Sequence, residues 1–296
     1  VGRDGCISWF CLPAFDSRPL VAGLLDAERG GSFDVTPVGL QASAQRYLPD
    51  TGVLVTELQG LGGRLELTDC MPLRSGADLG EQVPAGRGEL LRLARTVSGT
   101  VEVDVRLAPW DGLHVRRELG AWRLHWPAHP DLELHLWCSA ELEARRDGSI
   151  GGRVELREGE LLTVSMHWAG QTHTRARTAP QRLVDQTVAA WRDWAEHIDY
   201  DGPQRELVRR SAVTLKLLDH AATGAIMAAA TSSLPEEIGG VRNWDYRYTW
   251  VRDAAFTTYA LRRIGMREEA DSFLAWTLRN VERDERTSIV YTLDGQ

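Results

Sequence analysis

The stretch Val101-Glu102-Val103-Asp104-Val105-Arg106-Leu107 alternates apolar and charged residues with a period of two. Successive side chains of a β-strand point to opposite faces, so this alternation predicts a strand with one buried and one solvated face. Similar patterns recur up to about residue 171, at 122–126, 132–136, 154–156 and 162–168. The turn signals Asp111-Gly112, Asp147-Gly148 and Glu158-Gly159 separate these segments. We therefore expect antiparallel hairpins and a β-sandwich rather than a parallel sheet.

The hydrophobic period then changes to three and four residues. In 181–198 the apolar positions Val184, Val188, Trp191, Ala195 and Ile198 form the stripe of an amphipathic helix. Further helices are expected at about 204–222, 251–264 and 267–283, and a long loop at 223–250, which contains Gly and Pro and no sustained period. The sequence therefore predicts a β-sandwich domain at 1–178, a helical linker at 179–202 and a helical domain at 203–296.

Composition describes an ordinary globular protein, with 296 residues, 43% hydrophobic and 26% charged. The net charge of −8 argues against nucleic acid, because phosphates require a basic face. The longest uncharged run, 221–235, is too short to span a bilayer, so no membrane partner is expected. The four cysteines, Cys6, Cys11, Cys70 and Cys138, are unevenly spaced, which favours reduced thiols and a cytoplasmic location.

No cofactor or metal is expected. Cys6 and Cys11 lack a CxxC pattern or a nearby His, and the several histidines show no helical i, i+4 ligand spacing. Gly239-Gly240 lacks the spacing of a dinucleotide site. The sequence leaves open whether loop carboxylates bind calcium.

Residues 243–253, which read NWDYRYTWVRD, hold four aromatic rings, two guanidinium groups and two carboxylates. A sugar ring offers an apolar face to aromatic rings and hydroxyls to charged groups, so this composition suits carbohydrate. Trp244, Tyr246, Tyr248 and Trp250 have even spacing and would line one face of an extended segment, directly before Arg252 and Asp253. The alternative is structural: buried rings, and an Arg–Asp pair that caps the next helix. Composition alone leaves both possibilities open.

The residues around this stretch resemble the glucoamylase family of glycoside hydrolases, especially its bacterial glucoamylase-like and trehalase-like members. The similarity runs through 222–226, 231–236 and 238–254. Gly2-Arg3-Asp4-Gly5, Gln45-Arg46-Tyr47-Leu48-Pro49-Asp50 and Thr68-Asp69-Cys70-Met71-Pro72 resemble the amino-terminal domain of the same members. The resemblance implies a β-sandwich plus α fold: an amino-terminal super-β-sandwich, a helical linker and the truncated start of an (α/α)6 barrel.

The resemblance also implies a sugar site. The Arg and Asp of the family's Trp-x-Arg-Asp motif bind hydroxyls of the non-reducing terminal glucose and correspond to Arg252 and Asp253, with Trp250 beside them. Tyr246 and, less directly, Tyr248 are expected to line the same subsite. Family members hydrolyse by inversion with two glutamates. We assign no catalytic residue here, because both glutamates are expected beyond Gln296; the adjacent Glu236 and Glu237 are better interpreted as a solvated loop edge.

The functional expectation is inverting, exo-acting hydrolysis of an α-glucosidic bond at the non-reducing glucose of an oligosaccharide, a glucan or trehalose. The chain is expected to be a fragment, inactive alone, that holds the substrate grip without the catalytic pair. The alternative is a non-catalytic carbohydrate-binding or assembly subunit. The expected partners are the sugar and either a second copy or a complementing chain carrying the rest of the barrel, and the sequence leaves the substrate linkage undecided.

Overall fold

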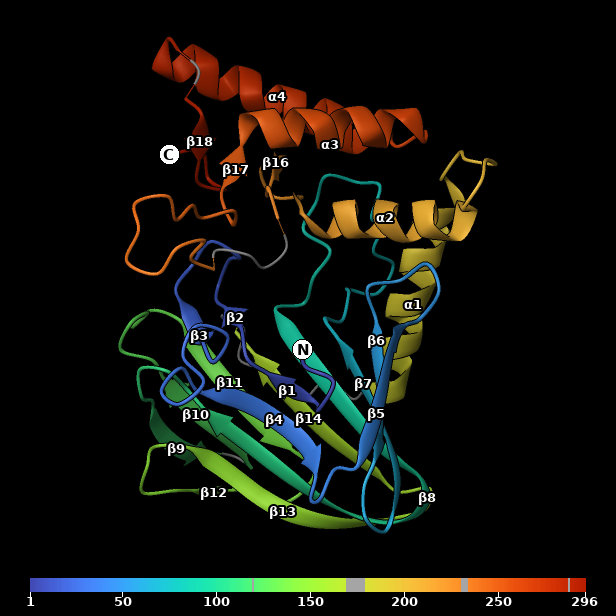
Figure 1. Ribbon diagram of the computed structural model, residues 1–296, viewed down its shortest axis with the longest axis vertical. Helices are drawn as coiled ribbons and strands as arrows, with labels where there is room; N and C mark the ends of the chain where they lie inside the picture. Colours follow the sequence, from blue (N-terminus) through green and yellow to red (C-terminus); the bar gives the residue numbers. More distant parts are fainter. Residues whose placement is uncertain (119, 169–178, 230–233, 287) are drawn as a thin grey trace. The chain divides into compact units, whose positions relative to one another are not determined.

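The computed structural model describes residues 1–118, 120–168, 179–229, 234–286 and 288–296 (Figure 1). It divides into two compact units. Unit 1 comprises Val1–Leu48, Val53–Leu73 and Gly86–Thr187, and unit 2 comprises Pro49–Gly52, Arg74–Ala85 and Val188–Gln296. The expected boundary at residue 178 lies outside the described residues, as do Thr231, Ser232 and Ser233 of the family resemblance. The three-domain division stays a prediction.

Unit 1 is built from antiparallel strands. They are β1 (Cys6–Ile7), β2 (Phe10–Cys11), β3 (Pro19–Val21), β4 (Ser32–Pro37), β5 (Ala42–Tyr47), β6 (Leu54–Gln59), β7 (Gly63–Cys70), β8 (Glu89–Ala108), β9 (His114–Glu118), β10 (Ala121–His125), β11 (Glu133–Cys138), β12 (Glu143–Ala144), β13 (Ile150–Arg157) and β14 (Leu161–His167). The main path runs β5-β6-β7-β8-β14-β11-β10-β9, and β8 also pairs with β4 and β13. The antiparallel arrangement is confirmed, and β12 pairs with β13 across the predicted turn at Asp147-Gly148. The turns at Gly112 and Gly159 are not hairpins, since β9 after Gly112 pairs with β10, and β13 and β14 on either side of Gly159 each pair with β8. All three glycines have the positive φ that their turns require.

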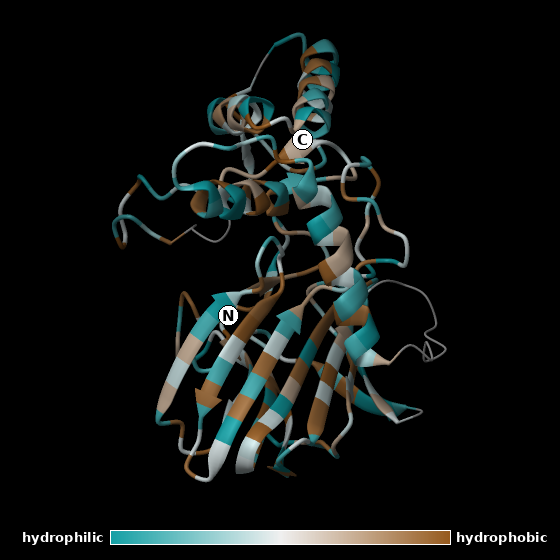
Figure 2. Ribbon diagram, turned by 90° about the vertical axis from the view of Figure 1, so that its right-hand side faces the viewer, coloured by the Kyte–Doolittle hydropathy of each residue, from teal (hydrophilic) through white to brown (hydrophobic). Residues whose placement is uncertain are grey.

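Strand β8 belongs to two sets of strands. Its first half pairs with β7 and β14, for example Leu93 with Thr68 and Thr163, whereas its second half pairs with β4 and β13, for example Val103 with Pro37 and Val154. Apolar side chains from both sets form one buried cluster. Brown and teal therefore alternate along the strands in Figure 2, as the period of two predicts. The result is a large antiparallel sheet with sandwich-like strands.

The Arg92 side chain is fully buried in unit 1. Its guanidinium donates to both Asp69 carboxylate oxygens at 2.7 and 3.3 Å, to the Phe33 carbonyl at 2.6 Å and to the Gly5 carbonyl at 2.6 Å. The group therefore links the amino-terminal segment, β4, β7 and β8. A charge this deep is tolerated because its donors are satisfied by an opposite charge and by carbonyls.

Unit 2 contains the helical part of the chain. The helices are α1 (Pro180–Glu196), whose first half belongs to unit 1, α2 (Arg205–Leu217), α3 (Val251–Arg263) and α4 (Arg267–Asp284), and the short strands are β15 (Asp219–His220), β16 (Ala225–Ile226), β17 (Thr249–Trp250) and β18 (Val290–Tyr291). The predicted helices are confirmed, with one correction: the second ends at Leu217 rather than at residue 222. Asp219 and His220 instead pair with β16 across a turn at Gly224, which has a φ of +86°.

The core of unit 2 contains both aromatic and charged groups. Phe273 and Trp276 of α4 stack at 5.6 Å, and Tyr291 of β18 meets Trp276 edge-on at 5.4 Å. Beside α2, the Lys216 ammonium lies 2.8 Å from Asp219 and 3.0 Å from Glu269. Burial raises the pKa of the Asp219 carboxyl, despite its ion pair with Lys216. The expected (α/α)6 barrel stays a prediction.

Candidate functional site

The segment that carries the candidate residues is held on both sides by backbone hydrogen bonds within unit 2. Ala228 and Ala229 donate to the carbonyls of Tyr248 and Tyr246 at 3.1 and 3.0 Å. On the other side, Thr249 and Trp250 of β17 pair with β18. Residues far apart in sequence therefore fix the long loop where it enters α3.

A turn at Tyr246 and Arg247 bends this segment. The Asp245 carboxylate accepts the Arg247 backbone N–H at 2.9 Å and two guanidinium nitrogens at 3.1 and 2.7 Å. The Asp245 carbonyl accepts the Trp250 indole N–H at 2.9 Å. The segment is thus not extended throughout 244–250, because the Asp245 side chain offers the backbone a local alternative to a strand.

Three rings meet because of this turn. Tyr246 and Trp250 stack with centroids 5.6 Å apart and an interplanar angle of 29°, and Trp244 meets Trp250 edge-on at 5.8 Å. We call the rings of Trp244, Tyr246 and Trp250 the ring platform. Trp244 is 48% exposed, and Tyr246 and Trp250 are partly buried. Tyr248 is also partly buried. The platform therefore differs from the Phe273, Trp276 and Tyr291 cluster, which is core.

The charged pair follows the platform within the first turn of α3. Trp250 is the N-cap and makes no side-chain cap hydrogen bond. The side chain of Arg252 is 76% exposed and that of Asp253 is 34% exposed, with 3.7 Å between an Arg252 guanidinium nitrogen and Asp253 Oδ2. That oxygen is itself buried from solvent and accepts no hydrogen bond within the described part of the chain. The Arg252 guanidinium therefore reaches solvent, whereas Asp253 is only partly exposed and its Oδ2 lies below the surface.

Glu236 and Glu237 lie on the exposed edge of the same loop. The Tyr246 hydroxyl lies 3.5 Å from Glu236 Oε1. Asn243 closes the loop by accepting from the Glu237 N–H at 3.2 Å and donating to the carbonyls of Glu237 and Gly240 at 3.0 and 3.1 Å. The exposure of Glu236 and Glu237 supports the expectation that they form a solvated loop edge.

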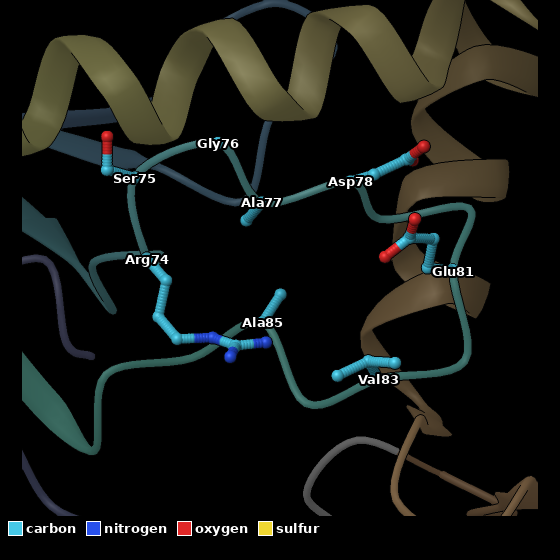
Figure 3. A pocket seen from close by; sticks show the side chains of 8 residues that line it. All are labelled: Arg74, Ser75, Gly76, Ala77, Asp78, Glu81, Val83 and Ala85. Atoms are coloured by element: carbon cyan, nitrogen blue, oxygen red, sulfur yellow. The ribbon is translucent and has the colours of Figure 1, made fainter.

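A pocket of about 340 Å³ lies elsewhere in unit 2 and is lined by Arg74, Ser75, Gly76, Ala77, Asp78, Glu81, Val83 and Ala85 (Figure 3). Arg74 extends towards Ala85 in this view. None of the five predicted site residues lines the pocket, and its lining contains no aromatic ring. It therefore lacks the surface on which a sugar would stack.

Sequence reasoning did not assign a role to Asp245 and Arg247, although the quoted motif contains both. The sequence signal that could have indicated their contact is the Asp-x-Arg spacing directly before Tyr248. An Asp side chain often accepts a hydrogen bond from the backbone N–H two residues further along the chain. The Asp and Arg side chains are 25% and 13% exposed. Their contact closes the turn that carries Tyr246.

Within 1–118, 120–168, 179–229, 234–286 and 288–296, no group of three metal-ligating side chains gathers. All four cysteines carry reduced thiols. Burial raises the pKa of both Cys6 and Cys70 to about 12. Among the same residues, no helix combines the length and apolarity needed to cross a membrane.

Comparison with known proteins agrees with the proposed family. Residues 202–296 match the model of glycosyl hydrolases family 15, and residues 1–121 match the model of the trehalase-like N-terminal region. The chain therefore carries a glycosyl hydrolase family 15 region and a trehalase-like N-terminal region. This confirms the resemblance to the glucoamylase family that the sequence motifs indicate.

Several curated relatives have the name trehalase. The chain is 33% identical to the trehalase of Mycolicibacterium smegmatis, over 93% of this chain and 44% of that protein. It is 33% identical to the trehalase of Mycobacterium tuberculosis, over 100% and 47%, and 30% identical to that of Thermoplasma acidophilum, over 100% and 51%. The chain thus spans about half the length of the curated relatives it matches.

Proposed function

We propose that this protein is a glycoside hydrolase that cleaves the α-glucosidic bond of trehalose, and that the present chain holds one glucose unit of the substrate. The family 15 region and the relatives named trehalase support the class and the substrate. The observation that carries the site is local. The stacked rings of Tyr246 and Trp250 directly precede an open Arg252–Asp253 pair.

The chemistry follows from these groups. A ring of the platform packs against the C–H face of glucose, the Arg252 guanidinium donates hydrogen bonds to hydroxyl oxygens, and the Asp253 carboxylate accepts hydrogen bonds from hydroxyl groups. Each charge-assisted hydrogen bond contributes about 1.5–3 kcal/mol. Neither ionic group is neutralised by a short mutual contact, since 3.7 Å separates them. The pair can therefore bind a sugar without first breaking a strong ion pair.

Inverting hydrolysis needs two further carboxyl groups, about 6.5–9.5 Å apart, one to protonate the leaving oxygen and one to activate water. We assign neither role to this chain, since Glu236 and Glu237 are adjacent and exposed. In this proposal the chain contributes binding rather than proton transfer. The 296-residue chain alone should then bind sugar without releasing glucose.

Calorimetry and a glucose assay test the proposal. The purified chain is titrated with trehalose, maltose and isomaltose, and glucose release is measured from each. Trp250→Leu should weaken trehalose binding about tenfold. The lost contact between the indole ring and the apolar face of the sugar is expected to contribute about 1.4 kcal/mol, which corresponds to a factor of ten. Trp110→Leu, at an exposed Trp of unit 1, is the control and should leave trehalose binding unchanged. Equal affinities for the wild type and Trp250→Leu would contradict the site.

A second function, a non-catalytic carbohydrate-binding or assembly subunit, is favoured by one observation. Large apolar side chains are exposed on both helices that follow the site. Phe256 and Tyr259 of α3 are 71% and 65% exposed, and Leu274 and Leu278 of α4 are 53% and 52% exposed. Exposed apolar surface on this scale is typical of a contact with another chain. Light scattering distinguishes the possibilities, because an assembly subunit would not be monomeric.

The cytoplasmic location stays a prediction.

A further inference from the structure

Asp245 and Arg247 form an ion pair with unusually complete local geometry. The Asp245 carboxylate accepts from Arg247 Nε at 3.1 Å to each oxygen and from a terminal guanidinium nitrogen at 2.7 Å. It also accepts the Arg247 backbone N–H at 2.9 Å. With side chains 25% and 13% exposed, the pair is partly shielded from water. Such a forked contact fixes direction as well as distance.

The pair controls the ring platform through the backbone. Tyr246 is the residue between the two partners, so the turn that the pair closes sets where its ring points. The Asp245 carbonyl accepts the Trp250 indole N–H at 2.9 Å, so the same peptide also sets the orientation of the second ring. Tyr246 and Trp250 consequently stack at 5.6 Å.

We infer that Asp245 and Arg247 are positioning residues that hold the rings of Tyr246 and Trp250 in the orientation that binds glucose. This inference rests on the proposed function. Holding a binding surface in its bound conformation raises affinity, because the ordering cost is met before the ligand arrives. The partners are two residues apart, so their mutual contact closes only a short loop.

Two readouts separate positioning from a general structural role. The chain is labelled with 15N-tryptophan, and the Trp250 indole resonance is identified by its loss in Trp250→Phe. Its chemical shift and hydrogen-exchange rate report ring orientation, and calorimetry with trehalose and D-glucose reports sugar affinity. The variants are Asp245→Ala, which removes every side-chain contact, and Asp245→Asn, which keeps an acceptor for the Arg247 N–H. Asp271→Ala is the matched control, from the exposed Arg262–Asp271 pair at 3.5 Å.

Asp245→Ala should shift the Trp250 indole resonance, speed its exchange about tenfold and weaken sugar binding about tenfold, without lowering the thermal midpoint more than Asp271→Ala does. Asp245→Asn should give about a threefold effect on both readouts, as a partial rescue. If Asp245→Ala does not fold, Asp245→Asn decides, since it preserves the turn acceptor.

An unchanged indole resonance in a folded Asp245 variant overturns the inference. So does a moved resonance with wild-type sugar affinity, and in that case weak binding by Arg252→Ala shows that the proposed function survives. If the wild-type chain binds neither sugar, the proposed function fails, and the indole readout alone decides whether the pair orients the rings.

Discussion

The Arg92–Asp69 pair of unit 1 and the Arg252–Asp253 pair of unit 2 have the same chemistry but opposite surroundings. In unit 1 the guanidinium of Arg92 is 0% exposed and lies 2.7 Å from Asp69. In unit 2 the side chain of Arg252 is 76% exposed and lies 3.7 Å from Asp253. The first pair also satisfies two backbone carbonyls, whereas the second leaves a carboxylate oxygen without a hydrogen bond in the described part of the chain.

The contrast shows what distinguishes a structural pair from the pair that we propose binds sugar. Arg92 and Asp69 already use their hydrogen-bonding groups within unit 1. A ligand could bind them only by breaking these internal hydrogen bonds. Arg252 has access to solvent, and Asp253 is partly exposed, although its Oδ2 is buried. Residue identity is the same in both cases, so surroundings decide the role.

The largest expected effect is on stability in unit 1. Arg92→Met should lower the free energy of unfolding by about 3–5 kcal/mol, because Asp69 would remain buried without its counter-charge and two carbonyls would lose a donor. Urea unfolding followed by circular dichroism measures it. Arg46→Met, at the exposed Arg46–Glu57 pair, should cost no more than about 1 kcal/mol. Equal losses in the two variants would erase the distinction between buried and open pairs.

The next effect is on sugar affinity in unit 2. Arg252→Met should weaken trehalose binding by about 10–150-fold, equivalent to about 1.5–3 kcal/mol, because a charge-assisted hydrogen bond is removed. Its free energy of unfolding should stay within about 0.5 kcal/mol of the wild type. Arg262→Met, another exposed arginine of α3, should retain both properties. A stability loss like that of Arg92→Met would instead make the pair structural.

The smallest effect concerns pH. Burial raises the pKa of Glu89, whose carboxylate lies 3.2 Å from Arg87 and 3.3 Å from His167. The folded state therefore binds this proton more tightly than the unfolded state does. Protonated Glu89 therefore contributes its full stabilisation below the pKa of the unfolded state. This contribution is lost as pH rises through the raised pKa of the folded state.

Glu89→Gln should therefore gain stability relative to the wild type as pH rises above the unfolded pKa, with a slope of at most about 1.4 kcal/mol per pH unit. Urea unfolding at closely spaced pH values measures the difference. Glu57→Gln, on an exposed strand position, is the control and should run parallel to the wild type. A Glu89→Gln curve parallel to the wild type across the whole range would mean that the buried carboxyl does not titrate differently on folding.

Much of the fold could be predicted because it depends on local periodicity. The alternation in Val101–Leu107 and the stripe from Val184 to Ile198 each report which side of an element is buried, and the strands and helices follow them closely. The helix end at Leu217 could not be predicted, because a pairing between Asp219 and Ile226 competes with the helix there. Such a pairing depends on residues beyond the local window.

The candidate site was predictable in content but not in form. The motif specified aromatic, Arg and Asp side chains, and the comparisons confirm the family that the motif resembles. The meeting of Tyr246 with Trp250 depends on a turn that the even spacing of the rings did not indicate. The roles of the individual site residues stay predictions.

Amino-acid order by itself determined the antiparallel strands, the helices that follow them and the family, since these depend on side-chain period and motif. Only the tertiary structure decided which Arg–Asp pair is buried and which is exposed, and that the Trp250 indole donates to the Asp245 carbonyl. The physical reason is that burial and hydrogen-bond satisfaction belong to a residue's surroundings, which segments distant in sequence supply.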